Sequence, residues 1–98
     1  MEIEVSLNGN MLTISPAGRV DTATAPQLHT VVSDNIAGVT DLTFDLKKLD
    51  YISSAGLRVL MSAQKIMNKQ GHMRLIHVNG DVMDIFDMTG LTDVFDIQ

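Results

Sequence analysis

Two adjacent serines, Ser53 and Ser54, stand in a run of small residues completed by Ala55 and Gly56. Small residues let the backbone bend tightly, and either hydroxyl could cap the free amides of a helix that begins here. The amide donors and the positive end of a helix dipole also favour a negative group, including a phosphate attached to the serine itself. A serine in this position is expected to be exposed. The run is therefore a candidate switch.

Other chemistries have less support from the residues. The chain lacks Gly-x-Ser-x-Gly and a Gly-Lys-Ser/Thr phosphate loop, so neither a nucleophile elbow nor nucleotide hydrolysis is expected. His29, His72 and His77 fall in a predicted helix, turn and strand, with no evident pairing and no metal-ligand spacing. Three acidic residues lie on a predicted short helix: Asp81, Asp84 and Asp87. A calcium-binding loop needs a different backbone conformation, so no calcium site is expected there. We expect no catalytic residue, no metal and no cofactor.

Composition limits the class of protein. The 98 residues are 45% hydrophobic and 19% charged, which suits one globular domain over residues 1–98. A net charge of -5 with only seven Lys and Arg argues against direct nucleic-acid binding. There is no cysteine, no signal-peptide pattern and no apolar run long enough for a bilayer. We expect a cytoplasmic protein that does not insert into a membrane.

The elements around the serines follow from hydrophobic periodicity. Apolar residues alternate with polar ones over residues 3–7 and 12–14, and Asn8-Gly9 between them predicts an antiparallel hairpin. Pro16 and Gly18 end or kink its second strand. A helix follows, with Thr22 or Thr24 as its N-cap, Pro26 in its first turn, apolar residues at helical spacing over 28–36, and a stop at Gly38.

A central strand is predicted over residues 42–46, and a helix runs from the serines to about Gln70. That helix has an apolar stripe of Leu57, Leu60, Ala63 and Met67. A strand over 73–78, a short helix capped by Asp81 and ended by Gly90, and a last strand over 94–97 complete the chain. Alternating strands and helices indicate parallel pairing with right-handed crossovers. The predicted fold is α/β: a mixed β-sheet with an N-terminal hairpin, parallel core strands and helices packed on the sheet.

Sites in such sheets lie at the carboxyl ends of the parallel strands. We therefore expect the loop around Asp21 and the end of the strand that carries Asp45 to lie at the same end as the serines.

Three segments, in order, resemble the STAS domain of bacterial anti-sigma factor antagonists. The first is Asp45-Leu46 together with residues 51–60, which read YISSAGLRVL. The second is residues 18–26, GRVDTATAP, and the third is residues 85–91, IFDMTGL. The resemblance covers nearly the whole chain and implies a STAS-like fold.

The resemblance also implies a function. In that family a serine at the start of the second helix is phosphorylated by a kinase that is also the anti-sigma factor. The unphosphorylated protein binds this kinase and frees the sigma factor, and a serine phosphatase resets the switch. By its position before Gly56-Leu57, the acceptor corresponds to Ser54. The partner-binding surface implied by the resemblance and by the serine turn comprises Asp21, Thr22, Asp45, Ser53, Ala55, Gly56, Leu57 and Arg58.

Two departures from the family pattern leave alternatives open. The classic members carry Asp immediately before the acceptor, where this chain has Ser53, so Ser53 is the second candidate for phosphorylation. The chain also stops at Gln98, about where the family usually adds a last helix. Two other functions remain: a STAS subunit of a bacterial ABC-type lipid transporter, and a phosphocarrier or small enzyme that passes the phosphate on.

Overall fold

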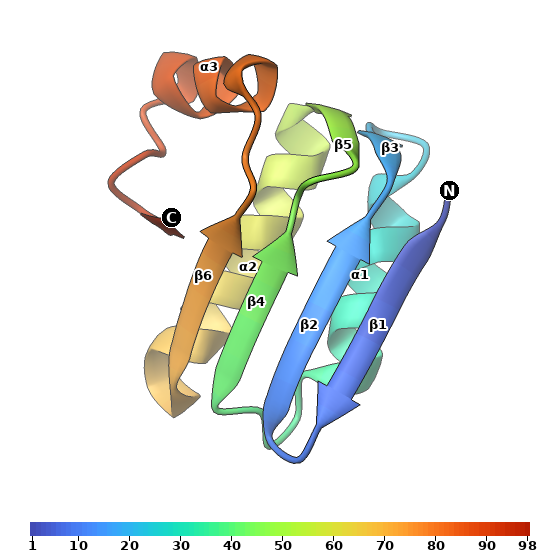
Figure 1. Cartoon of the computed structure of the whole chain (residues 1–98), viewed down its shortest axis with the longest axis vertical. Coiled ribbons are helices and arrows are strands. Elements are labelled where there is room, and N and C mark those ends of the chain that lie inside the picture. Colours follow the sequence, from blue (N-terminus) through green and yellow to red (C-terminus); the bar gives the residue numbers. More distant parts are fainter.

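A five-stranded mixed sheet forms the centre of the protein, whose computed structural model describes all residues from Met1 to Gln98 (Figure 1). The strands lie in the order β1 (Ile3–Asn8), β2 (Met11–Pro16), β4 (Asp41–Asp45), β6 (His72–Ile76) and β7 (Asp96–Ile97). β1 and β2 form the predicted antiparallel hairpin, and every other neighbouring pair is parallel. The predicted α/β fold with a mixed sheet is confirmed.

A second, two-stranded sheet was not predicted. It pairs β3 (Gly18–Val20) with β5 (Leu49–Ile52) in parallel. The sequence pattern indicates neither strand, because three or four residues are too few to reveal a period. β5 lies between the central strand β4 and the serines, and it carries the chain beyond the end of the main sheet (Figure 1).

Two helices, α1 (Ala25–Asn35) and α2 (Ser54–Gln70), cover one face of the main sheet, and α3 (Gly80–Thr89) lies at the end of the sheet where β5 is found (Figure 1). The predicted stripe of α2 is buried at Leu57, Leu60, Ala63 and Met67. These side chains join a cluster of 23 buried apolar residues from both helices and the strands. No helix has the length and the apolar content that crossing a membrane requires.

Several predicted boundaries are corrected by the structure. Asn79, not Asp81, caps α3: its side chain accepts from the Val82 amide at 2.9 Å and donates to the Leu49 carbonyl at 2.7 Å. This double contact holds Asn79 against β5, which was absent from the sequence prediction. β6 covers residues 72–76 instead of 73–78, and the last strand is only Asp96–Ile97. The predicted end of α3 is confirmed, with Gly90 in the left-handed conformation at φ 72°.

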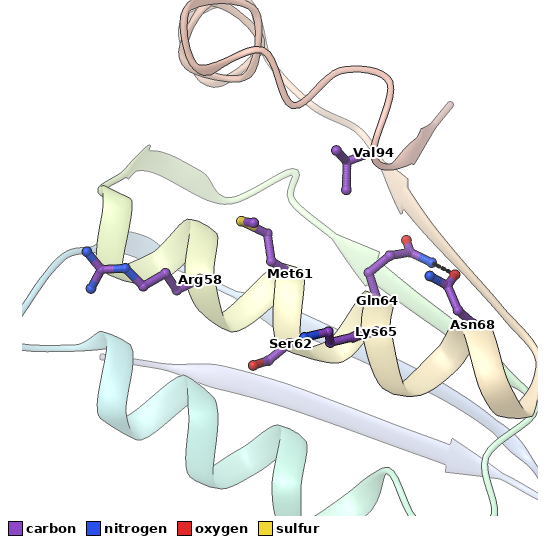
Figure 2. A pocket seen from close by; sticks show the side chains of 7 residues that line it. All are labelled: Arg58, Met61, Ser62, Gln64, Lys65, Asn68 and Val94. Atoms are coloured by element: carbon purple, nitrogen blue, oxygen red, sulfur yellow. Dashed lines mark hydrogen bonds between the residues drawn. The ribbon is translucent and has the colours of Figure 1, made fainter.

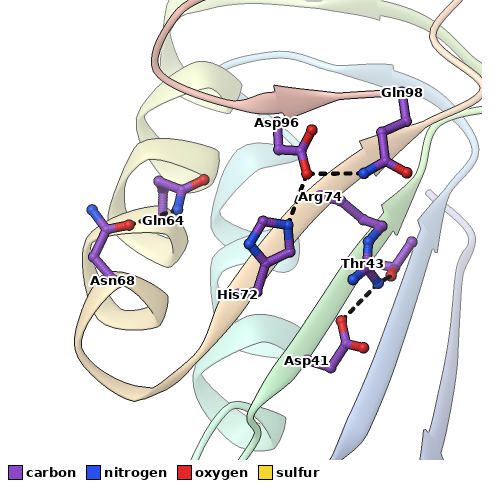
Figure 3. A network of polar contacts seen from close by, with 8 residues as sticks. All are labelled: Asp41, Thr43, Gln64, Asn68, His72, Arg74, Asp96 and Gln98. Carbon is purple, nitrogen blue, oxygen red and sulfur yellow. Dashed lines mark hydrogen bonds and ion pairs between the residues drawn. The ribbon is translucent and has the colours of Figure 1, made fainter.

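The sheet face opposite the two helices carries polar side chains that pair across strands (Figure 3). The Arg74 guanidinium donates to Asp41 at 2.7 Å and to Thr43 at 3.0 Å. His72 and Asp96 contact each other at 2.8 Å, which fastens the short β7 to β6. Cross-strand pairs of this kind support a sheet whose second face is solvated.

Candidate functional site

Pairing between β3 and β5 brings the Asp21 loop and the serine turn together. Val20 lies opposite Ile52 in the parallel register, and the next residue along each strand is Asp21 or Ser53. The Ser53 amide donates to the Val20 carbonyl at 2.8 Å, which continues the pairing beyond the strands. The expected proximity of these two segments is confirmed, and a strand pair that the sequence did not reveal produces it.

Ser53 precedes α2 with an extended backbone, φ -90° and ψ 176°. Its carbonyl accepts from the Leu57 amide at 2.9 Å, which starts the helix. Its side chain makes no capping hydrogen bond, and its Oγ is buried without any hydrogen-bond partner. The prediction that a serine hydroxyl caps this helix is therefore wrong.

Ser54 is the first residue of α2, and its side chain is exposed. The first turn holds no acidic residue and receives no capping side chain, so the amide donors at this helix end lack a negative partner within the chain. Helix amides and the helix dipole favour an anion at such an end. Of the two serines, Ser54 offers an accessible hydroxyl and Ser53 a buried one.

Asp21 organises the loop that faces the serine turn. Its Oδ1 accepts from the Ala23 amide at 3.0 Å and from the Thr24 amide at 3.1 Å. The Thr24 amide bond is the main cause that lowers the pKa of Asp21, outweighing the effect of burial, and the Ala23 amide and the Arg19 charge add to it. Asp21 is therefore a fixed negative charge beside the serines.

The N-cap prediction for α1 holds only in part. Thr24 precedes the helix, while Thr22 lies exposed in the loop. The Thr24 hydroxyl makes no capping bond; it accepts from the Asp21 amide at 2.9 Å and donates to the Arg19 carbonyl at 2.8 Å. The Asp21 carbonyl accepts from the Ala25 amide at 2.8 Å. Asp21 thus accepts hydrogen bonds from the amides just before and at the start of α1, where a threonine was expected to act as the cap.

Asp45 lies at the end of β4, and β5 separates it from the serines. Its Oδ1 contacts His77 Nδ1 at 2.9 Å and accepts from the Lys47 amide at 3.1 Å. Partial burial raises the pKa of Asp45, but the hydrogen bonds from His77 and Lys47 outweigh it and leave the pKa below the ordinary value. Asp45 is therefore bonded to His77 and Lys47, and none of its hydrogen bonds reaches the Asp21 loop or the serine turn.

The other predicted contact residues divide by exposure. Gly56 and Leu57 are buried and Ala55 is half-buried. A Cβ added to Gly56 would lie 2.6 Å from both Ile52 Cγ1 and Val20 Cγ1, so glycine lets α2 approach the small sheet closely. Arg58 is exposed. A partner could reach Ser54 and Arg58 directly, whereas Gly56 and Leu57 position them.

Sequence reasoning missed three side-chain pairs. The Arg19 guanidinium lies over the Tyr51 ring, 4.4 Å from its centroid, at a position where β3 and β5 are in register. The other two are the histidine pairs with Asp45 and Asp96. All three join residues far apart in the chain, and only the strand register could have indicated them.

The largest surface hollow, about 400 Å³, lies further along α2 (Figure 2). Met61, Lys65 and Val94 contribute to its walls, and Arg58 stands at the end nearest the serines. No group of three His, Asp or Glu side chains is arranged to hold a metal ion. At the serine turn, the exposed side chain is that of Ser54.

Comparisons with known proteins identify a family from the sequence and a shared fold from the structure. A family model described as the STAS domain matches residues 2–98. The anti-sigma-B factor antagonist of Bacillus subtilis is 32% identical over 99 residues, covering 100% of this chain and 91% of that protein. An anti-sigma-factor antagonist (STAS) domain protein from Planctomyces limnophilus superposes with a TM-score of 0.86 at 18% identity, covering 98% of this chain and 87% of that chain. The Bacillus cell fate determinant SpoIIAA in its phosphorylated form superposes with a TM-score of 0.76 at 16% identity, covering 99% and 91%. These two structures share the fold of this protein.

Proposed function

The chain belongs to the STAS domain family, and on that premise we propose that it is an anti-sigma factor antagonist whose binding is switched by phosphorylation of Ser54. The unphosphorylated protein binds an anti-sigma factor kinase and thereby frees the sigma factor. Phosphorylation releases the kinase, and a serine phosphatase restores the first state. The protein acts in the cytoplasm by binding alone and catalyses no reaction of its own.

The observation that carries this proposal is the contrast between the two serines. Ser54 is exposed at the first turn of α2, whereas the Ser53 Oγ is buried. A kinase must bring the γ-phosphate of ATP in line with the acceptor oxygen, which a buried hydroxyl does not allow. The contrast supports Ser54 as the acceptor, with Ser53 contributing to the turn that presents it.

The chemical step is a phosphoryl transfer from ATP held by the kinase. The bond between Ser54 Oγ and the γ-phosphorus forms while the bond from that phosphorus to the β–γ bridging oxygen breaks. ADP leaves, and the hydroxyl proton passes to a base of the kinase. The STAS chain supplies only the acceptor and its fixed position at the end of β5.

The added charge accounts for the switch. A phosphoserine carries about -1.5 to -2 charges at neutral pH. The free amides of the α2 end can accommodate this charge without a change of fold, while Asp21 already makes the neighbouring loop negative. A kinase surface complementary to the neutral turn would then meet two negative groups side by side. Release follows from repulsion and from the cost of removing water from the phosphate.

Paired substitutions at Ser54 test the proposal. Candidate anti-sigma factor kinases from the same cell are titrated against wild type, Ser54→Ala and Ser54→Asp. Ser62→Ala, at an exposed serine further along α2, is the control. We expect Ser54→Ala to bind with or without ATP, Ser54→Asp to bind more weakly, and Ser62→Ala to lose binding with ATP as wild type does. If Ser54→Ala and Ser54→Asp both behave like wild type, Ser54 is not the switch.

A further inference from the structure

We propose that Arg58 is the positioning residue for the phosphorylated state, pairing with the phosphate on Ser54 across one turn of α2. This inference rests on the proposed function, because it concerns the same modified serine. It assigns a role in holding the phosphate to a residue that sequence reasoning placed only among partner contacts.

The helix geometry places the two side chains together. Ser54 and Arg58 are four residues apart in α2, and both are exposed. Residues at this spacing lie on one helix face with Cβ atoms about 5–6 Å apart, and an anion on the N-terminal side of a cation is the favourable order. Figure 2 shows the Arg58 side chain extending towards the N-terminal end of α2, which is the end that Ser54 begins.

Arg58 has no other partner. It takes part in none of the ion pairs of the chain, which join Lys48 to Glu4, His72 to Asp96, Arg74 to Asp41 and His77 to Asp45. The next cation on the same face of α2 is Lys65, which lies about 16 Å along the axis from Ser54. Arg19, the cation of β3, lies over the Tyr51 ring. Arg58 is therefore the cation best placed for a phosphate on Ser54.

The surrounding charges make such a cation useful. Two acidic residues flank the serine turn. Asp21 directly follows Val20, whose carbonyl accepts from the Ser53 amide, and Asp50 on β5 precedes Ser54 by four residues. Both would repel a phosphate on Ser54, and α2 brings no acid of its own to its first turn. A guanidinium can donate two hydrogen bonds to phosphate oxygens, which a lysine cannot do in the same geometry. Arg58 thus offsets the acidic surroundings and favours the doubly charged phosphate.

The experiment installs phosphoserine at position 54 during translation and follows the ³¹P chemical shift from pH 4 to pH 8. Four proteins are compared: the parent and its Arg58→Gln, Arg58→Lys and Lys65→Gln variants. Lys65→Gln is the matched control, since it also removes one exposed cation from α2. The free energy of an ion pair between side chains four residues apart in a helix corresponds to a change of about 0.2–0.4 unit in the second pKa of the phosphate. We expect Arg58→Gln to raise that pKa by at least this amount, Arg58→Lys to raise it less, and Lys65→Gln to leave it unchanged.

An equal pKa in the parent and in Arg58→Gln would overturn the inference, as would an equal rise in both Gln variants. The ¹⁵Nε resonance of Arg58, compared between serine and phosphoserine at position 54 without further substitution, gives a second reading that needs no variant to fold. We expect it to shift on phosphorylation, and an unshifted resonance counts against the pair. Because translation installs the phosphate, neither result depends on a kinase. The proposed function fails separately, if the cellular protein never carries phosphate on Ser54.

Discussion

The backbone amide of Ser53 donates to the carbonyl of Val20 at 2.8 Å and joins two segments more than thirty residues apart. The loop after Val20 is held by the hydrogen bonds of Asp21, and the first turn of α2 follows Ser53. Any movement of the serine turn must therefore break a strand-like hydrogen bond or move β3 with it. The proposed phosphate on Ser54 would therefore change the charge of this surface while the fold stays fixed.

The stability of Ser53→Ala tests whether the Ser53 hydroxyl caps α2 or is buried without a hydrogen-bond partner. A lost N-cap costs about 1 kcal/mol. The Ser53 Oγ has no hydrogen-bond partner, and a buried hydroxyl without a partner is itself costly. We expect Ser53→Ala to leave the free energy of unfolding unchanged or to raise it slightly, measured by urea denaturation. A loss of about 1 kcal/mol or more would mean that the hydroxyl finds a partner in solution.

Gly56→Ala tests the close approach of α2 to the small sheet. The new methyl group would lie 2.6 Å from Val20 and Ile52 side-chain atoms, so α2 or the strands must shift. We expect a loss of about 1–3 kcal/mol in the free energy of unfolding, as in other overpacked sites. Gly80→Ala in the first turn of α3 is the control, because a Cβ there meets nothing within 4 Å. Equal stability of the two variants would contradict the close packing of α2 against the β3–β5 pair.

Leu60→Ala tests which side of α2 faces the sheet. Leu60 is 1% exposed and Met61, the next residue, is 42% exposed. Removal of a fully buried leucine side chain costs about 2–5 kcal/mol. We expect that loss for Leu60→Ala in chemical denaturation and less than about 1 kcal/mol for Met61→Ala, because surface changes are usually small. A reversed order would mean that α2 is rotated about its axis.

The contacts of Asp45 predict sensitivity to acid. Its pKa is lowered in the folded protein, so the unfolded chain binds the proton more tightly. The stabilisation is fully present above the ordinary value of 3.8 and is lost as the pH falls below it through the folded pKa. We expect Asp45→Asn to be less stable than wild type at pH 7 and the gap to narrow below the ordinary pKa. Asp50→Asn, on an exposed residue without an ion pair, is the control. A gap that stays constant with pH would show that the charge of Asp45 is not what stabilises the fold.

The sequence predicted those elements of the fold in which apolar residues recur at the spacing of a strand or a helix. The hairpin of residues 3–16, the central strand β4 and the buried stripe of α2 all have apolar residues at a regular spacing, and each is confirmed. The small sheet could not be predicted in this way. β3 and β5 have three and four residues, and their pairing depends on contacts between distant parts of the chain.

The site was predicted to a similar extent. Small residues followed by a helical stripe located the serine turn, and the order of strands and helices placed the Asp21 loop beside it. The sequence alone did not predict the roles of the individual side chains within the turn. A serine before a helix usually caps it, yet Ser53 has a buried Oγ and Asp21 serves the neighbouring helix instead. Histidine pairing also depended on the strand register, since His72 meets Asp96 and His77 meets Asp45 only in the folded chain.

The most direct test of phosphorylation at Ser54 is mass spectrometry of the protein after incubation with ATP and the anti-sigma factor kinases of its own cell. Intact mass gives the number of phosphates, peptide fragmentation gives their position, and Ser54→Ala and a reaction without kinase are the controls. We expect one phosphate on Ser54, none on Ser53 and none in either control. Phosphate on Ser53 alone, or a protein that no kinase modifies or binds, would contradict it.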